Sequence, residues 1–155
     1  MYTLELTVNG VGYKVEVEAS TNLLEVLRDK LGITSPKVGC ETGDCGTCSV
    51  IMNGKLVKSC ITNALMAQGA DVLTVEGLGR PGELHPLQKA FHEYYAAQCG
   101  FCTPGMILAA KALLDENPNP TRDEVKEYLS GNLCRCTGYV KIVDAVMAAA
   151  EEMRR

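Results

Sequence analysis

Residues 39–48 read GCETGDCGTC, a stretch in which three cysteines and three glycines fall within ten positions. The thiols belong to Cys40, Cys45 and Cys48, and no histidine lies among them. Closely spaced cysteine thiolates are ligands for zinc and for iron. Glycine permits positive φ and a close approach of the backbone. We therefore predict that this loop wraps tightly around a small metal group, and that the chain beyond it supplies the remaining ligands.

A β-hairpin downstream brings a fourth cysteine to the loop. The stretch TCSVIMNGKLVKSCI, residues 47–61, turns at Asn53-Gly54, a pair typical of two-residue hairpin turns. Such a turn places Cys48 and Cys60 nearly opposite each other at the open end, with Cα atoms on the order of 5–8 Å apart. The four cysteines then have the plant-type ferredoxin spacing for a 2Fe–2S cluster. A four-cysteine zinc site is the alternative, although zinc sites more often contain two CxxC-like knuckles.

Four further cysteines form a second group. Cys99 and Cys102 make one pair and Cys134 and Cys136 the other, and no cysteine lies between Cys60 and Cys99. Each pair immediately precedes a predicted helix, whose free N–H groups and partial positive charge suit an anionic cluster. A CxxC motif combined with CxC can also hold zinc. The spacing alone therefore leaves two possibilities for this site, a second cluster or a zinc ion.

Composition and charge exclude several classes of protein. A net charge of −4 without a basic stripe argues against nucleic acid as a partner. No apolar run approaches the roughly 20 residues that span a bilayer, and the N-terminal MYTLELTVNG lacks a secretory signal. We therefore expect a cytoplasmic protein with no membrane span. In a reducing cytosol, clustered thiols are more readily explained by metal than by disulfides.

Periodicity divides the 155 residues into a mixed half and a helical half. In the first half we expect hairpins over 2–18 and 47–61, a helix over 23–31 and a strand over 72–75. The stretch EGLGRPGELH, residues 76–85, is rich in Gly and Pro and indicates a linker. Helices are then expected over 86–97, after Thr103, after Thr121 and along a stripe from Val140 to Met147. The fold class is α+β, with domains at 1–76 and 77–155, the second an all-α four-helix bundle.

Capping signals indicate where these helices begin. Pro86 suits a first helical position, Thr103 can cap the second helix, and Thr121 with Glu124 fits the capping box of the third. His85 is expected in the linker and His92 on a helix surface. Because eight cysteines already fill two sites, neither histidine is expected to bind metal.

Together these motifs resemble the small iron–sulfur subunit of the molybdenum hydroxylases, the xanthine oxidase family. The resemblance is carried by VGCETGDCGTC at 38–48, Cys60, QCGFCTPGM at 98–106 and GNLCRCTGY at 131–139, and it covers nearly the whole chain. It implies a plant-type ferredoxin-like (β-grasp) domain followed by a four-helix domain, each holding one 2Fe–2S cluster. At the second site it favours iron over zinc.

The resemblance also implies a role and partners. The chain would relay single electrons between a large molybdopterin-binding subunit and, usually, an FAD-binding medium subunit, within a hetero-oligomeric oxidoreductase. The second cluster would lie nearer the molybdenum, and no residue of this chain would be catalytic. Gln98 and Cys136 match positions that approach the molybdopterin. A free-standing ferredoxin-like carrier and a zinc-stabilised interaction module are the alternatives.

Overall fold

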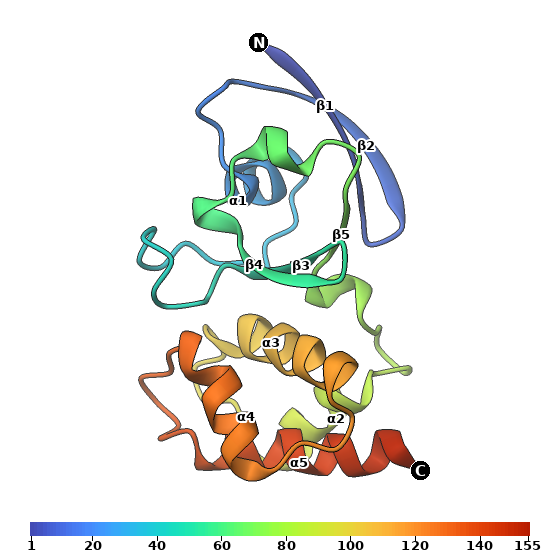
Figure 1. The fold of residues 1–155 in the computed structure, drawn as a ribbon, viewed down its shortest axis with the longest axis vertical. Coiled ribbons are helices and arrows are strands. Elements are labelled where there is room, and N and C mark those ends of the chain that lie inside the picture. Colours follow the sequence, from blue (N-terminus) through green and yellow to red (C-terminus); the bar gives the residue numbers. More distant parts are fainter.

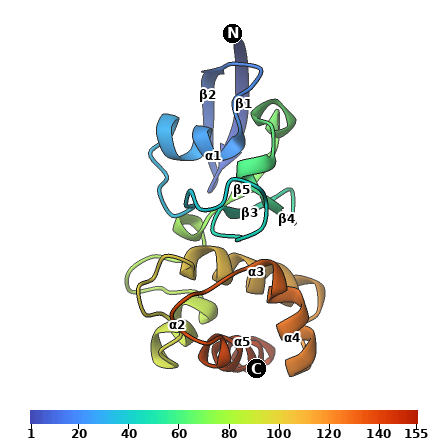
Figure 2. The ribbon, with the colours of Figure 1, turned by 90° about the vertical axis from the view of Figure 1, so that its left-hand side faces the viewer.

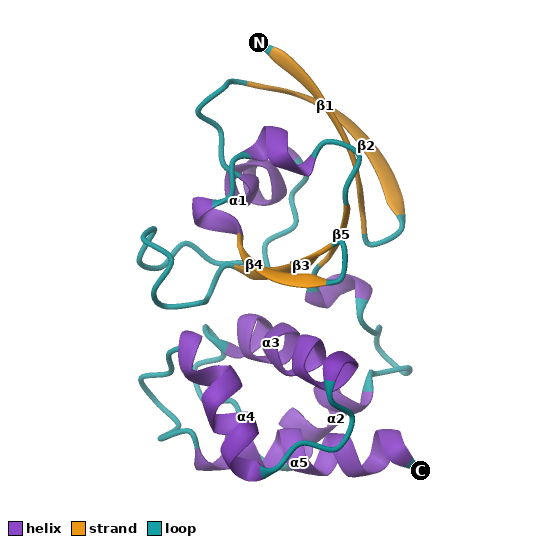
Figure 3. Ribbon diagram, in the orientation of Figure 1, coloured by secondary structure: helices purple, strands orange, loops and turns teal.

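A five-stranded sheet and a group of helices occupy opposite ends of the molecule in the computed structural model, which describes residues 1–155 (Figure 1). The strands are β1 (Tyr2–Val8), β2 (Val11–Val17), β3 (Ser49–Met52), β4 (Lys55–Lys58) and β5 (Asp71–Leu73). The helices are α1 (Leu23–Glu25), α2 (Pro86–Glu93), α3 (Thr103–Glu116), α4 (Arg122–Tyr128) and α5 (Val140–Arg154). Figure 3 shows that every strand lies in the N-terminal half, which confirms the α+β class.

Both predicted hairpins form, and they lie at the two edges of the sheet. The strand order is β2-β1-β5-β3-β4, with β1 and β5 parallel and the other neighbours antiparallel. Both residues of each turn, Asn9-Gly10 and Asn53-Gly54, have positive φ, as the two-residue turns of right-twisted hairpins require. The second hairpin therefore has the predicted register, in which Ser49 pairs with Lys58.

The first hydrophobic core lies between this sheet and α1. Alternate residues of β1, namely Leu4, Leu6 and Val8, are buried, as the two-residue period of a strand dictates. Buried leucines of α1, and of the π-helical turn Val26–Lys30 that continues it, pack against them. The helix predicted over 23–31 and the strand predicted near 72 are thus both present.

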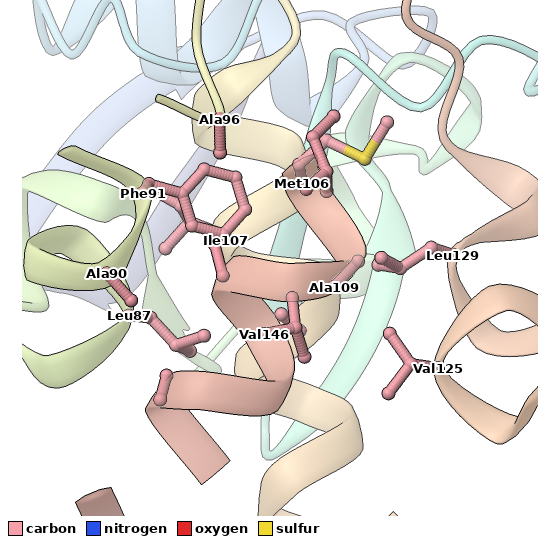
Figure 4. Packing of buried hydrophobic residues seen from close by; sticks show 14 of the residues in the cluster. Leu87, Ala90, Phe91, Ala96, Met106, Ile107, Ala109, Val125, Leu129 and Val146 are labelled. Atoms are coloured by element: carbon pink, nitrogen blue, oxygen red, sulfur yellow. The ribbon is translucent and has the colours of Figure 1, made fainter. Parts of the chain in front are cut away.

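The second hydrophobic core is shared by α2, α3, α4 and α5. Figure 4 shows Phe91, Ile107, Val125 and Val146, one buried side chain from each helix, converging in it. Of these four helices, α3 lies nearest the sheet in the side view of Figure 2. Because α3 has apolar residues on two faces, it also packs against β3, in a smaller cluster centred on Leu108. No helix in the structure combines the length and apolar character needed to cross a bilayer.

Helix boundaries agree with the capping signals at some ends and differ at others. The Thr121 capping box is confirmed: Glu124 N–H donates to Thr121 Oγ1 at 3.2 Å, and Thr121 N–H donates to Glu124 Oε2 at 2.7 Å. The prediction that Thr103 caps α3 is wrong, because Thr103 is the first helical residue and Cys102 occupies the N-cap. Helix α2 ends at Glu93, short of the predicted residue 97, because the chain turns left-handed at Tyr95, where φ is +54°.

His85 has a structural role that the sequence did not reveal, since it caps α2. Its Nδ1 accepts the Leu87 N–H at 3.1 Å, and its own N–H donates to Gln88 Oε1 at 3.0 Å. Burial lowers the pKa of His85, and the nearby Lys111 on α3 lowers it further, against an opposing effect of Asp115.

Acid is therefore expected to weaken this cap. The folded chain favours neutral His85, so the stabilisation is complete above the unfolded pKa of about 6.5 and is lost as the pH falls below it. A protonated Nδ1 cannot accept the Leu87 N–H. His85→Asn keeps a capping side chain that does not titrate near neutral pH. It should flatten the pH dependence of the urea midpoint between about pH 7.5 and 5. An unchanged slope would assign the acid sensitivity to other groups.

Candidate metal centres

Backbone N–H groups converge on the sulfur of Cys40. Those of Thr42, Asp44 and Cys45 each donate to Cys40 Sγ at 3.3 Å, and Cys40 N–H donates to Cys45 Sγ at 3.4 Å. Hydrogen bonds from Thr42, and then from the Cys45 backbone, lower the pKa of Cys40 to about 6. The loop thus favours the thiolate, which is the form of cysteine that binds metals.

The glycines of the loop serve two different purposes. Gly43 and Gly46 have φ of +84° and +76°, as predicted for residues that turn the chain left-handed. Gly39 shows the other property of glycine, a close approach of the backbone. Its φ is not positive, yet an added Cβ would lie 2.6 Å from Cys45 Sγ. Gly39 therefore makes room for a cysteine sulfur.

The second hairpin brings Cys60 to Cys48, as its register predicts. Ser59, which follows β4, donates from its Oγ to the Cys48 carbonyl at 2.6 Å. The 3₁₀ turn Ser59–Ile61 then places the Cys60 thiol beside the Cys48 thiol. Burial, and then this neighbouring thiol, raise the pKa of Cys60 to about 11.

The four thiols of the second quartet come together although their two motifs are about 30 residues apart in the chain. The thiols of both Cys134 and Cys99 influence that of Cys102. Burial, and then the Cys134 thiol, raise the pKa of Cys102 to about 12. Burial alone would raise the pKa of Cys134, but hydrogen bonds from Thr137, whose hydroxyl lies 3.1 Å from Cys134 Sγ, lower it overall. The Cys99 side chain raises the pKa of Cys136.

The hydrogen bonds to sulfur indicate how these thiols would hold a metal group. Three backbone N–H groups donate to Cys40 Sγ, and the Thr137 hydroxyl lies 3.1 Å from Cys134 Sγ. Such donors stabilise thiolate charge and tune a bound iron–sulfur cluster. The donors to sulfur therefore fit the ligation of an anionic cluster by both quartets.

The residues predicted to approach the molybdopterin lie at the surface. Gln98 is exposed and directly precedes Cys99, which is itself exposed, as is Cys136. In contrast, Cys48 and Cys102 are buried. One edge of the second quartet is therefore open to the surroundings, and Gln98 stands beside that edge.

Asn132 is a residue that sequence reasoning missed. It joins the segments that carry the two quartets. Asn132 is buried, and its Nδ2 donates to Gly46 O at 3.1 Å and to Ser49 Oγ at 3.3 Å. Its partners lie 86 and 83 positions away along the chain, so no local pattern could reveal them. The only sequence signal was the position of Asn132 within a cysteine motif.

The carbonyl group of Gly46 also lies close to Gly105 in α3. This approach reverses the expected effect of a glycine-to-alanine substitution on stability. Alanine in place of a helical glycine normally stabilises by about 0.5–1 kcal/mol. A Cβ on Gly105, however, would lie 2.4 Å from the carbonyl oxygen of Gly46, and a backbone atom cannot swing away. We expect Gly105→Ala to lower the free energy of unfolding by about 1–3 kcal/mol in urea titrations. Gly12→Ala, where an added Cβ meets nothing within 4 Å, is the control, and a stabilised Gly105→Ala variant would contradict the packing.

Comparison with known proteins places both quartets in recognised domains. The family model for the 2Fe-2S iron-sulfur cluster binding domain matches residues 6–74, and the model for the [2Fe-2S] binding domain matches residues 74–147. Together they cover the two groups of cysteines described above.

Relatives in other organisms are similar over nearly the whole chain. The aldehyde oxidoreductase of Megalodesulfovibrio gigas is 52% identical, with 94% of this chain but only 16% of that protein covered. The nicotinate dehydrogenase small FeS subunit of Eubacterium barkeri is 49% identical, with 96% and 95% covered. The solved structure of quinoline 2-oxidoreductase from Pseudomonas putida 86 matches with a TM-score of 0.94, at 46% identity over 99% of this chain and 96% of that one. The chain therefore belongs to the family of small iron–sulfur subunits of the molybdenum hydroxylases.

Proposed function

We propose that this chain is an electron-transfer subunit that carries single electrons between a molybdopterin site and a flavin or other acceptor. The first 2Fe–2S cluster would be held by Cys40, Cys45, Cys48 and Cys60, and the second by Cys99, Cys102, Cys134 and Cys136. The observations that carry the proposal are the N–H groups directed at the Cys40 sulfur and the hydrogen bond that joins the segments bearing the two quartets. Each cluster, once bound, takes up and gives off one electron at a time.

Hydrogen bonds within the first loop would help to hold its ligands in place. Cys40 and Cys45 are joined by N–H···S hydrogen bonds in both directions, so these two ligands would be held together. N–H groups directed at sulfur stabilise negative charge there, so the loop of the first cluster helps to set its potential.

We further propose that the chain has two domains, at 1–76 and 77–155, the second a four-helix bundle. The two large hydrophobic clusters support this division, since one lies in the sheet half and the other among the helices. The proposed boundary falls within the 3₁₀ turn Val75–Gly77.

Exposed apolar side chains indicate where partners would bind. Close in sequence to the cysteines of the second quartet lie Tyr95, Phe101, Leu133 and Val140, all exposed. Exposed apolar side chains, where they gather, mark protein interfaces. The large molybdopterin-binding subunit would cover this surface in a hetero-oligomer, and Gln98 would offer its amide to the pterin, which approaches Cys136.

A second exposed pair lies beside the first quartet. Val38 and Ile61 are next to cysteine-bearing segments and are both exposed. An FAD-binding medium subunit, where present, would bind at this end. Such a complex would work in the cytoplasm, where the thiolates are kept reduced.

Purification of the tagged chain from its own cells tests the proposal. The chain should elute with a much larger polypeptide that carries molybdenum, and the sample should show two 2Fe–2S signals by EPR. A monomer that elutes alone with both clusters would favour a free-standing carrier. A colourless monomer that contains zinc would favour an interaction module.

A further inference from the structure

One hydrogen bond links the segments that carry the two quartets. The Leu133 N–H donates to the Cys45 carbonyl at 2.8 Å. Leu133 directly precedes Cys134 in the chain. This single hydrogen bond therefore completes a short path, otherwise covalent, from the sulfur of Cys45 to the sulfur of Cys134. It is the only backbone–backbone hydrogen bond between residues 39–48 and residues 131–139.

Asn132 fixes the position of this link. Its side chain is only 3% exposed, and its Nδ2 donates to Gly46 O and to Ser49 Oγ, on the residues that flank Thr47 and Cys48. Its Oδ1 is buried without a hydrogen-bond partner, so the two bonds from Nδ2 are the ones that the side chain makes. Breaking them would leave a buried donor unpaired, at a cost in free energy, so Asn132 and the loop of the first quartet are held together. Leu133, one residue further along, is thereby held on the carbonyl of Cys45.

The backbone of the first loop packs closely against the backbone at Gly131. A Cβ on Gly46 would lie 2.4 Å from the carbonyl oxygen of Gly131. That same carbonyl also accepts a hydrogen bond from Lys58 Nζ at 2.5 Å. The segment that begins at Gly131 therefore packs against the first loop and is hydrogen-bonded to Lys58 at the end of β4.

We propose that Asn132 is a positioning residue for electron transfer between the two clusters, because it holds the Leu133 N–H on the Cys45 carbonyl. Electronic coupling falls off more slowly along covalent bonds and hydrogen bonds than across gaps, so this link would provide a short bonded route between the two sites. With clusters bound, it would carry a single electron from the reduced site to the oxidised one, without transfer of a proton. The inference rests on the proposed function, since it requires both sites to hold clusters.

The test compares two isosteric variants of the full, cluster-loaded chain. Asn132→Asp keeps the size of the side chain but replaces the donor with an acceptor. Asn9→Asp is the matched control. The Asn9 side chain also joins distant segments, since its Nδ2 donates to Thr74 Oγ1 at 2.8 Å. Asn9, however, lies in the first hairpin turn. The measurements are the rate of electron equilibration between clusters after rapid partial reduction, and the spin–spin splitting of the fully reduced chain by EPR.

We expect Asn132→Asp to slow equilibration severalfold and to change the splitting, while each cluster keeps its own EPR signal and its iron. Asn9→Asp should lose stability without changing either reading. Equal rates in Asn132→Asp and the unmodified chain, or equal slowing in both variants, would overturn the inference. An unmodified chain without clusters would instead refute the proposed function.

Hydrogen exchange gives a second measurement, which decides the matter if Asn132→Asp does not load iron. The Leu133 N–H should exchange slowly in the unmodified chain and markedly faster in Asn132→Asp, because the link that Asn132 holds protects it. Equal protection of Leu133 in the two chains would overturn the inference.

Discussion

Replacing Cys102 with serine should remove the iron of the second site and leave that of the first intact. Cys102 is buried at the N-cap of α3, and its thiol meets that of Cys134. Without it, one iron loses half of its protein ligands, so the cluster should not assemble. Iron content should fall from about four to about two per chain. One of the two EPR signals should disappear and the other should keep its line shape.

The reciprocal variant is the control for this prediction. Cys48→Ser removes a buried thiol from the first quartet, and it should abolish the other signal while the signal lost in Cys102→Ser remains. If either variant loses both signals and all iron, the two sites do not assemble independently, and their assignment to separate quartets would be contradicted.

Gly46→Ala should be among the most destabilising substitutions outside the cysteines, for two reasons that add. The residue has φ of +76°, which costs a residue with a Cβ about 1–2 kcal/mol. The new methyl group would also lie 2.4 Å from the carbonyl oxygen of Gly131, and such overpacking costs about 1–3 kcal/mol more. We expect a total loss of roughly 2–5 kcal/mol in the free energy of unfolding.

Gly54→Ala separates these two contributions. Gly54 has φ of +81°, yet an added Cβ there meets nothing within 4 Å. Urea unfolding of this variant should show the conformational cost alone, about 1–2 kcal/mol. If Gly46→Ala and Gly54→Ala lose the same amount, the close packing of the first loop against Gly131 would be contradicted.

Local signals explain why much of the fold could be predicted. The Asn-Gly turns and the alternation around them specify both hairpins, because register follows from turn length. The Thr121 capping box is equally local. The register of the second hairpin, and with it the return of the chain from Ser59 to Cys48, followed from the second turn.

Other features depend on contacts that no local pattern encodes. The cap on α2 is a histidine, a residue outside the usual capping set, and the early end of that helix depends on the left-handed conformation of Tyr95. The approach of the two cysteine motifs of the second quartet and the buried contacts of Asn132 arise only when segments distant in the sequence meet. The approach of Gln98 to a pterin remains a prediction, because its partner would lie on another chain.

Elemental analysis of the freshly purified chain tests the central claim most directly, namely that both quartets of thiolates hold iron. Iron, zinc and acid-labile sulfide would be measured on the same sample. We predict about four iron atoms and about four sulfides per chain, with no stoichiometric zinc. Stoichiometric zinc without labile sulfide, or oxidised cysteines without metal, would contradict the claim.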